Sequence, residues 1–252
     1  MSDESGHPSF ELPPDTAAKI WRYMDFTKFV AMLDSAALFF CRVDLLGDPF
    51  EGSVPRANED YWKALREEHG GDEAILQSNK AFLGNMARFS RQRTYVNCWH
   101  VNEHESAAMW QLHSREDASI AIQSRCLLLQ QCLPAHVSVG LVRYTDYDKE
   151  PIPPFNILDY CLHKRKSFEH ERELRALIWT LEADAKTREP AWTVEPGQPG
   201  ILVPVNLATL IETIYVAPGC PLWFEELVGK VTRRFGLSLP VKRSKIADRP
   251  ML

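Results

Sequence analysis

The sequence predicts an α+β fold in which a mixed, largely antiparallel β-sheet is surrounded by helices. Strand-like and helix-like segments are interleaved without the regular βα alternation of a doubly wound fold. No glycine-rich phosphate loop of the usual kinds is present. The 252 residues, 45% hydrophobic and 25% charged, have an ordinary globular composition. We expect a flexible N-terminal arm over 1–16 and a single α+β domain over 17–252.

The first half of the chain shows strand and helix patterns in turn. Residues 19–24 alternate as a short strand, and Asp25 can cap a helix whose residues Phe29 and Leu33 share one apolar face. A turn follows the second strand, because Asp48 can bond its own backbone and Pro49 fixes φ. The expected strands are 37–43, 94–101, 118–122 and 137–147, and the expected helices are 57–69, 72–90, 106–112 and 126–133.

The second half begins with prolines between 151 and 154, which break the chain before a helix expected over about 156–168. Alternation then predicts a strand over 171–181, and charged residues with Pro and Gly predict a surface loop over 184–199. The expected elements after it are strands at 200–205, 211–217 and 241–246 and helices at 207–210 and 222–235, the last ending at Gly236.

The bulk features predict a cytoplasmic protein that is not bound to a membrane. The acidic N-terminus lacks the features of a signal peptide, and no apolar run approaches the roughly 18 residues of a membrane span. Six cysteines without paired spacing indicate reduced thiols. The net charge of −5 argues against nucleic-acid binding over the whole surface. The segment after Gly229 is nevertheless basic, and it could hold a nucleic acid or another phosphate-bearing ligand, or be ordinary solvated surface.

Two stretches near the N-terminus carry candidate binding residues. In Trp21-Arg22-Tyr23, period two separates the arginine from its aromatic neighbours, and such an arginine can bind phosphate or carboxylate bidentately. In Asp48-Pro49-Phe50-Glu51, a turn accounts for Asp48 but leaves Glu51 unexplained. An edge-strand arginine and a capped turn are the structural alternatives.

The third stretch is Cys98-Trp99-His100, followed by Glu105, Ser106 and Trp110. On a strand, Cys98 and His100 share one face and Trp99 takes the other. Glu105 and Ser106 suit the N-terminus of the next helix, where the dipole favours acids and serine can cap. We assign no metal ligands, because Cys98, His100 and His104 lack the paired spacing of zinc sites.

The fourth stretch, Phe168-x-x-Glu171-x-Glu173-x-Arg175, is the strongest candidate. Strand alternation places Glu171, Glu173 and Arg175 on one face, with the two carboxylates about 7 Å apart. One carboxylate is then expected to have a raised pKa unless a cation such as Arg175 compensates. Such a pair suits general acid–base chemistry or the stabilisation of a developing cation. A solvated, charged strand face is the alternative.

The order of these stretches resembles the bacterial family known as domain of unknown function 2971. The resemblance covers roughly residues 19–246, with Phe168 where relatives are expected to carry tryptophan. It rests on Trp21-Arg22-Tyr23, Leu38-Phe39-Phe40, Asp48-Pro49-Phe50-Glu51, Cys98-Trp99-His100, Glu105-Ser106, Met109-Trp110, Lys164, the fourth stretch and Ile211-Glu-Thr-Ile-Tyr-Val-Ala-Pro218.

A more distant resemblance is to ADP-ribosyltransferase-like folds, which carry a basic or histidine residue on a first strand and a glutamate on a later strand. It implies that Arg22 and either Glu171 or Glu173 occupy the matching positions. It also implies that the glutamate holds the ribose 2′-hydroxyl of NAD while the nicotinamide bond breaks, with an aromatic side chain packed on the nicotinamide.

These features predict a nucleotide- or NAD-processing transferase of the ADP-ribosyltransferase type. The expected catalytic residues are Glu171, Glu173 and His100, and NAD is the cofactor considered. The first alternative is a non-enzymatic ligand-binding or regulatory module of the defence or toxin–antitoxin type. The second is a Mg²⁺-dependent nuclease that uses Asp48, Glu51 and the glutamate pair, with Lys164 or Lys166. The expected ligand-binding residues are Arg22, Tyr23, Asp48, Glu51, Trp99, Glu105, Ser106, Trp110, Lys164 and Arg175.

Overall fold

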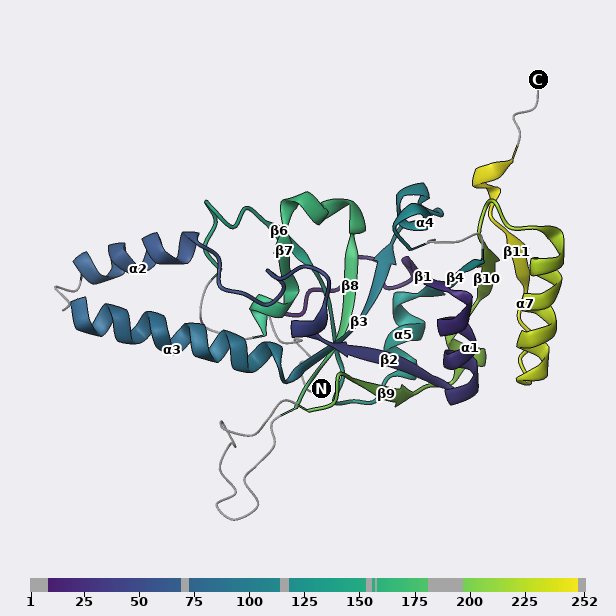
Figure 1. Ribbon diagram of the computed structural model, residues 1–252, viewed down its shortest axis with the longest axis horizontal. Coiled ribbons are helices and arrows are strands. Elements are labelled where there is room, and N and C mark those ends of the chain that lie inside the picture. Colours follow the sequence, from purple (N-terminus) through teal and green to yellow (C-terminus); the bar gives the residue numbers. More distant parts are fainter. Residues whose placement is uncertain are drawn as a thin grey trace, which may run out of the picture.

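The computed structural model describes residues 9–68, 73–113, 118–152, 156, 158–180 and 197–248. Within these ranges a mixed, mostly antiparallel sheet of nine strands forms the centre, with helices around it (Figure 1). The predicted α+β class is therefore confirmed. Figure 1 shows α2 (Ala57–Glu68) and α3 (Glu73–Arg91) side by side, projecting from one end of the sheet, with α7 (Leu222–Arg234) at the other end.

The strands and the remaining helices have the following bounds. The main sheet contains β1 (Lys19–Asp25), β2 (Ala37–Arg42), β3 (Thr94–Val101), β4 (Ser119–Arg125), β5 (Ser138–Leu141), β8 (Glu173–Trp179), β9 (Gly200–Pro204), β10 (Thr213–Val216) and β11 (Val241–Arg243). A separate parallel pair is formed by β6 (Arg143–Thr145) and β7 (His163–Arg165). The other helices are α1 (Phe26–Ser35), α4 (Ala107–His113), α5 (Cys126–Cys132) and α6 (Leu207–Leu210), and the 3₁₀ helices are η1 (Val43–Leu45), η2 (Asp159–Leu162), η3 (Lys166–Glu171) and η4 (Lys245–Ala247).

The sheet branches at β3. One edge of β3 pairs with β8 along its whole length, from Thr94 to His100. The other edge is shared, because β1 pairs near His100 and β2 pairs near Val96. The strand order is β11-β10-β4-β1-β3-β2-β9. Because β1 and β2 pair with different ends of the same edge of β3, a gap separates β1 from β2 beside the middle of β3.

The two faces of the sheet differ in chemistry, as period two requires. On one face, Ile20, Trp99, Ile122 and Ile214 are fully buried in the main core beneath helices that include α1 and α5. The opposite face, which we call the polar face, carries the residues in cross-strand register with Trp21: His100 on β3 and Gln123 on β4. The polar face also carries the strongest sequence candidates.

Three local predictions about the region from β5 to the start of β8 differ from the structure. The expected helix over 156–168 is replaced, in its described part, by η2, β7 and the start of η3. The expected strand over 171–181 begins only at Glu173, because Arg172 adopts a left-handed conformation with φ 40° and ends η3. The expected strand over 137–147 is likewise divided into β5 and β6. Short segments of this kind follow their tertiary partners more than their own propensities.

The N-terminal residues 9–16 contact the domain rather than standing apart. Leu141, at the end of β5, donates its backbone N–H to the carbonyl of Glu11 at 2.7 Å. Ser9 is buried, and its hydroxyl accepts from Asn156. The first eight residues of the predicted arm lie outside the described residues. In the described part of the chain, no helix combines the length and apolar character of a membrane span.

Helix α1 has a regular start and a strained end. Asp25 caps it as predicted, by accepting a hydrogen bond from Lys28 N at 2.8 Å. It ends at Ala36, whose φ of 45° lies in the left-handed region that disfavours side chains with a Cβ. Glycine is the usual residue at such a helix end.

We expect Ala36→Gly to raise the free energy of unfolding by about 1 kcal/mol, because glycine removes the left-handed strain. Ala31, exposed within α1, is the matched control. Ala31→Gly should lower the free energy of unfolding by about 1 kcal/mol, because glycine is a poor residue for a helix interior. Urea unfolding of both variants measures the two changes. Destabilisation by both substitutions would contradict the assignment of strain at Ala36.

Candidate functional site

Five charged side chains meet on the polar face: Glu51, Lys164, Glu171, Glu173 and Arg175. We call them the charge cluster. The ammonium of Lys164 lies 3.0 Å from Glu51 Oε1, 2.5 Å from Glu171 Oε2 and 3.4 Å from Glu173 Oε2. Three carboxylates therefore surround one lysine that is itself buried.

Arg175 supplies the second cation and is completely buried. Its Nε donates to Glu173 Oε1 at 2.8 Å, and its Nη2 lies 2.8 Å from Glu51 Oε2. Its Nη1 donates to the carbonyl of Cys161 at 2.7 Å. Buried charges persist only when they are paired and hydrogen-bonded, and this guanidinium meets both conditions.

Local structure explains why these residues converge. The register of β3 and β8 pairs His100 with Glu173 and Cys98 with Arg175. The predicted sharing of a face by Glu173 and Arg175 is therefore confirmed. Glu171 reaches the same place by another route, since it ends η3 and bonds Lys164 instead of lying on the strand.

The two glutamates of the fourth stretch have opposite pKa shifts. Burial alone raises the pKa of Glu173, but Arg175 and Lys164 outweigh it and hold that pKa at about 2. Burial raises the pKa of Glu171 despite its hydrogen bond from Lys164. Carboxylates whose pKa values are pushed apart in this way are suited to different roles in acid–base chemistry.

His100 lies beside Glu173 and has one unused ring nitrogen. Its Nδ1 lies 2.6 Å from the carbonyl oxygen of Glu171, which can only accept a hydrogen bond, so Nδ1 carries the proton. Burial lowers the pKa of His100, which favours the neutral ring. Within the described ranges its Nε2 is buried without a hydrogen-bond partner, and it is left as an acceptor.

Arg22 extends into the gap between β1 and β2. Its Nη2 is 3.5 Å from the carbonyl of Phe39, which also accepts from the amide of Asn97. Its Nη1 is buried and has no hydrogen-bond partner among the residues that the structure describes. Arg22 lies directly opposite Ile122 in the register of β1 and β4, so it leaves β1 on the core face and not on the polar face that carries Tyr23 and His100.

Aromatic side chains line the polar face next to His100. The Tyr23 ring lies 6.3 Å from that of His100 and 5.0 Å from that of Trp110, centroid to centroid. The Tyr23 hydroxyl accepts a hydrogen bond from Ser106 N at 2.9 Å. Glu105 accepts from Trp110 Nε1, so these two predicted binding residues support each other.

Two predicted binding residues lie apart from this group. Trp99 is on the opposite face, only 1% exposed, and donates its Nε1–H to Asn97. Its position is that of a core residue. Asp48 pairs with Arg165 at 2.9 Å and accepts from Phe50 N, as the turn interpretation requires.

His113, which the sequence interpretation missed, belongs to the same neighbourhood. Its ring stacks with that of Tyr23 at 6.4 Å. Burial lowers the pKa of His113, Lys28 and Arg22 lower it further, and Glu173 opposes them. His113 therefore lies within electrostatic reach of both Arg22 and the charge cluster. Its spacing of three from Trp110 on one helix face could have indicated it.

The acidic residues expected for a nuclease do not form a metal site here. Glu51, Glu171 and Glu173 are arranged around the ammonium of Lys164, and Lys166 pairs instead with Glu150 at the surface. Among the described residues, no group of three or more His, Cys, Asp and Glu side chains is placed to hold a metal ion.

Comparison with known proteins gives one weak similarity. No protein-family model matches the chain, so membership of domain of unknown function 2971 stays a prediction. No curated protein matches it significantly. The structure labelled "Thermus sp. 2.9 DarT in complex with carba-NAD+" is similar with a TM-score of 0.35 and 10% sequence identity, over 92% of this chain and 97% of that chain. A similarity of this size assigns neither a family nor an activity.

Proposed function

We propose that this protein is a transferase that cleaves the nicotinamide bond of NAD, or the equivalent bond of a related nucleotide, at the charge cluster. The observation that carries the proposal is that the pKa values of Glu173 and Glu171, two neighbouring carboxylates, are shifted in opposite directions. One carboxylate stays ionised because its pKa is held at about 2, and its neighbour has a raised pKa. Glu173 therefore provides a fixed negative charge, and Glu171 beside it provides a proton acceptor.

The charge of the cluster supports the same chemistry. With all five groups ionised, three carboxylates face two cations, so one negative charge is uncompensated. A preorganised negative charge stabilises the positive charge that develops on ribose C1′ as nicotinamide leaves. The exposed ring of His113, which stacks on the buried ring of Tyr23, offers a surface on which nicotinamide can pack.

The unpartnered nitrogens suit the polar groups of a nucleotide. Arg22 Nη1 can donate to a phosphate, and His100 Nε2 can accept from a ribose hydroxyl. A buried polar atom without a partner costs about 1–3 kcal/mol. A ligand that satisfies both atoms would remove that cost.

In the proposed step, the bond between ribose C1′ and nicotinamide N1 breaks, and its electron pair leaves with neutral nicotinamide. A lone pair on an acceptor oxygen or nitrogen forms the new bond to C1′. The acceptor's proton passes to the Glu171 carboxylate, which is partly exposed and therefore able to exchange it with water. Glu173 stays ionised throughout and holds the ribose hydroxyl.

Nicotinamide release from NAD, measured by chromatography, tests this proposal. We expect Glu171→Gln to lower the rate roughly 100- to 1,000-fold, because it removes the proton acceptor. Glu169→Gln, an exposed position on the same 3₁₀ helix, should leave the rate unchanged. The rate should fall with decreasing pH through the raised pKa of Glu171, above the ordinary value of 4.5.

The non-enzymatic alternative is decided by the same measurements. The observation that favours it is that every carboxylate of the charge cluster already contacts a cation, as in a purely structural network. Thermal stabilisation by NAD or another nucleotide without nicotinamide release would support this binding module and reject the transferase. Equal rates of nicotinamide release in the wild type, Glu171→Gln and Glu169→Gln proteins would also reject the proposed transferase site.

A further inference from the structure

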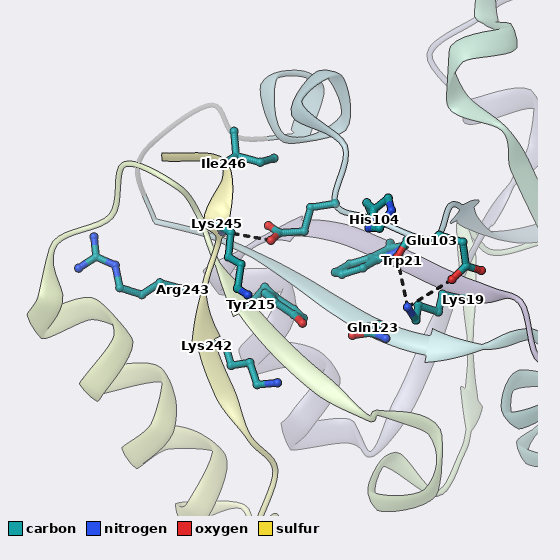
Figure 2. Close-up of a pocket in the computed structure, with 11 residues that line it drawn as sticks. Lys19, Trp21, Glu103, His104, Gln123, Tyr215, Lys242, Arg243, Lys245 and Ile246 are labelled. Atoms are coloured by element: carbon teal, nitrogen blue, oxygen red, sulfur yellow. Dashed lines mark hydrogen bonds and ion pairs between the residues drawn. The ribbon is translucent and has the colours of Figure 1, made fainter. Parts of the chain in front are cut away.

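A cavity lies on the polar face over β1, β4 and β10, and none of the five charge-cluster residues lines it. Its volume is about 440 Å³, which is within the range of ligand pockets. Its floor is formed by Trp21, Gln123 and Tyr215, which come from β1, β4 and β10 (Figure 2). The Trp21 and Tyr215 rings lie 5.1 Å apart, and Tyr215 is half-exposed to the cavity.

The walls of this cavity are basic in a chain whose net charge is −5. Lys19, Lys242, Arg243 and Lys245 line it, against the two acids Glu103 and Glu105. The parallel register of β10 and β11 places Lys242 directly beside Tyr215. The charges therefore belong to a folded sheet edge and not only to a basic sequence segment.

Two of these cations have protein partners of their own. Lys19 pairs with Glu103 at 3.2 Å. Arg243 donates to the carbonyl of Cys220, and Figure 2 shows its side chain directed away from Tyr215. Lys242 and Lys245 form no ion pair with any acid in the described ranges, and in Figure 2 the Lys245 side chain extends toward Tyr215 while that of Lys242 runs below it. Two exposed ammonium groups are therefore free to bind an anion.

Glu105 fixes the geometry of the wall. Its Oε1 accepts a hydrogen bond from Lys245 N at 3.2 Å, and its Oε2 accepts from Trp110 Nε1 at 3.1 Å. Both of its oxygens are used, which ties the loop before α4 to η4. Glu105 was expected to bind ligand, and this arrangement gives it a positioning role at the cavity.

From this geometry we infer that the cavity binds a nucleoside phosphate, with the phosphate on Lys242 and Lys245 and the base on Tyr215. Lysine ammonium groups recognise phosphate as point charges. A half-exposed tyrosine ring offers a stacking face for any base. The Gln123 amide in the floor offers both a donor and an acceptor to a base edge. This site is separate from the charge cluster, so it goes beyond the proposed transferase function.

The same chemistry could come from a free nucleotide or from one unit of a single strand, and two probes distinguish them. The first is adenosine 5′-monophosphate, and the second is a fluorescent single-stranded oligoadenylate of roughly ten nucleotides. Binding is measured by anisotropy and competition, without NAD present. Lys242→Gln and Lys245→Gln should each weaken binding about tenfold and make it less sensitive to salt.

Lys230→Gln on α7 is the control, since Lys230 is exposed, pairs with Glu226 and does not line the cavity. Tyr215→Leu should weaken binding of both probes, with thermal unfolding used to confirm that it folds. Competition between the two probes would identify a free nucleotide as a sufficient ligand. Binding of the strand alone would identify a nucleic acid. The inference is overturned if neither probe binds, or if the two lysine variants bind as Lys230→Gln does.

Discussion

Arg175→Met should lower the free energy of unfolding by about 3–5 kcal/mol, because it leaves buried carboxylates without their main counter-charge. Arg175 is completely buried and contacts Glu51 and Glu173 directly. After the substitution, Lys164 alone would face the three carboxylates of the charge cluster. Guanidinium-induced unfolding followed by circular dichroism measures the loss.

Arg143→Met is the matched control for this experiment. Arg143 pairs with Glu11 at 2.9 Å, but its side chain is 37% exposed and that of Glu11 is 63% exposed. Such a pair contributes at most about 1 kcal/mol. Combining Arg175→Met with Glu51→Gln should reveal a coupling of at least about 0.5 kcal/mol. A loss below about 1 kcal/mol for Arg175→Met would show that the charge cluster does not hold the fold together.

Glu173→Gln should lower nicotinamide release roughly 100- to 10,000-fold if the proposed function is correct, because it removes the fixed negative charge. The amide keeps the volume of the side chain and can still accept from Arg175. The substitution therefore tests charge rather than packing. Chromatographic measurement of nicotinamide under saturating NAD provides the rate.

The same variant gives a readout that does not depend on turnover. The pKa of Glu173 is depressed from 4.5 to about 2 by folding, so its ionisation stabilises the fold above pH 4.5. That stability, roughly 3 kcal/mol, is lost as the pH falls toward 2. The free energies of unfolding of wild type and Glu173→Gln should therefore differ most near neutral pH and converge near pH 2. Parallel curves would contradict the assigned ionisation, and altered stability with unchanged turnover would restrict Glu173 to a structural role.

The sequence predicted the parts of this molecule that depend on local periodicity. The strand character of residues 94–101 and the common face of Glu173 and Arg175 follow from alternation alone. Asp25 was identified as a helix cap from its position before an apolar helix. In each case the deciding interaction lies within a few residues of the chain.

The remaining features depend on contacts between distant segments. Glu51 joins Arg175 across 124 positions, and no periodic pattern records such a pairing. Arg172 takes a left-handed conformation that is uncommon outside glycine. The sequence therefore does not indicate that η3 ends just before Glu173. The sequence shows that the C-terminal segment is basic, but the position of Lys242 beside Tyr215 depends on the parallel register of β10 and β11.

The branch at β3 has a consequence for how the molecule unfolds. Three groups of strands meet on β3: β1 with β4, β10 and β11; β2 with β9; and β8 with β5. Two of these groups contain only two strands, which are too few to persist alone in water. Loss of β3 would thus release every group at once. We expect the sheet to behave as one cooperative unit, with β3 as the element whose protection from hydrogen exchange equals that of the whole protein.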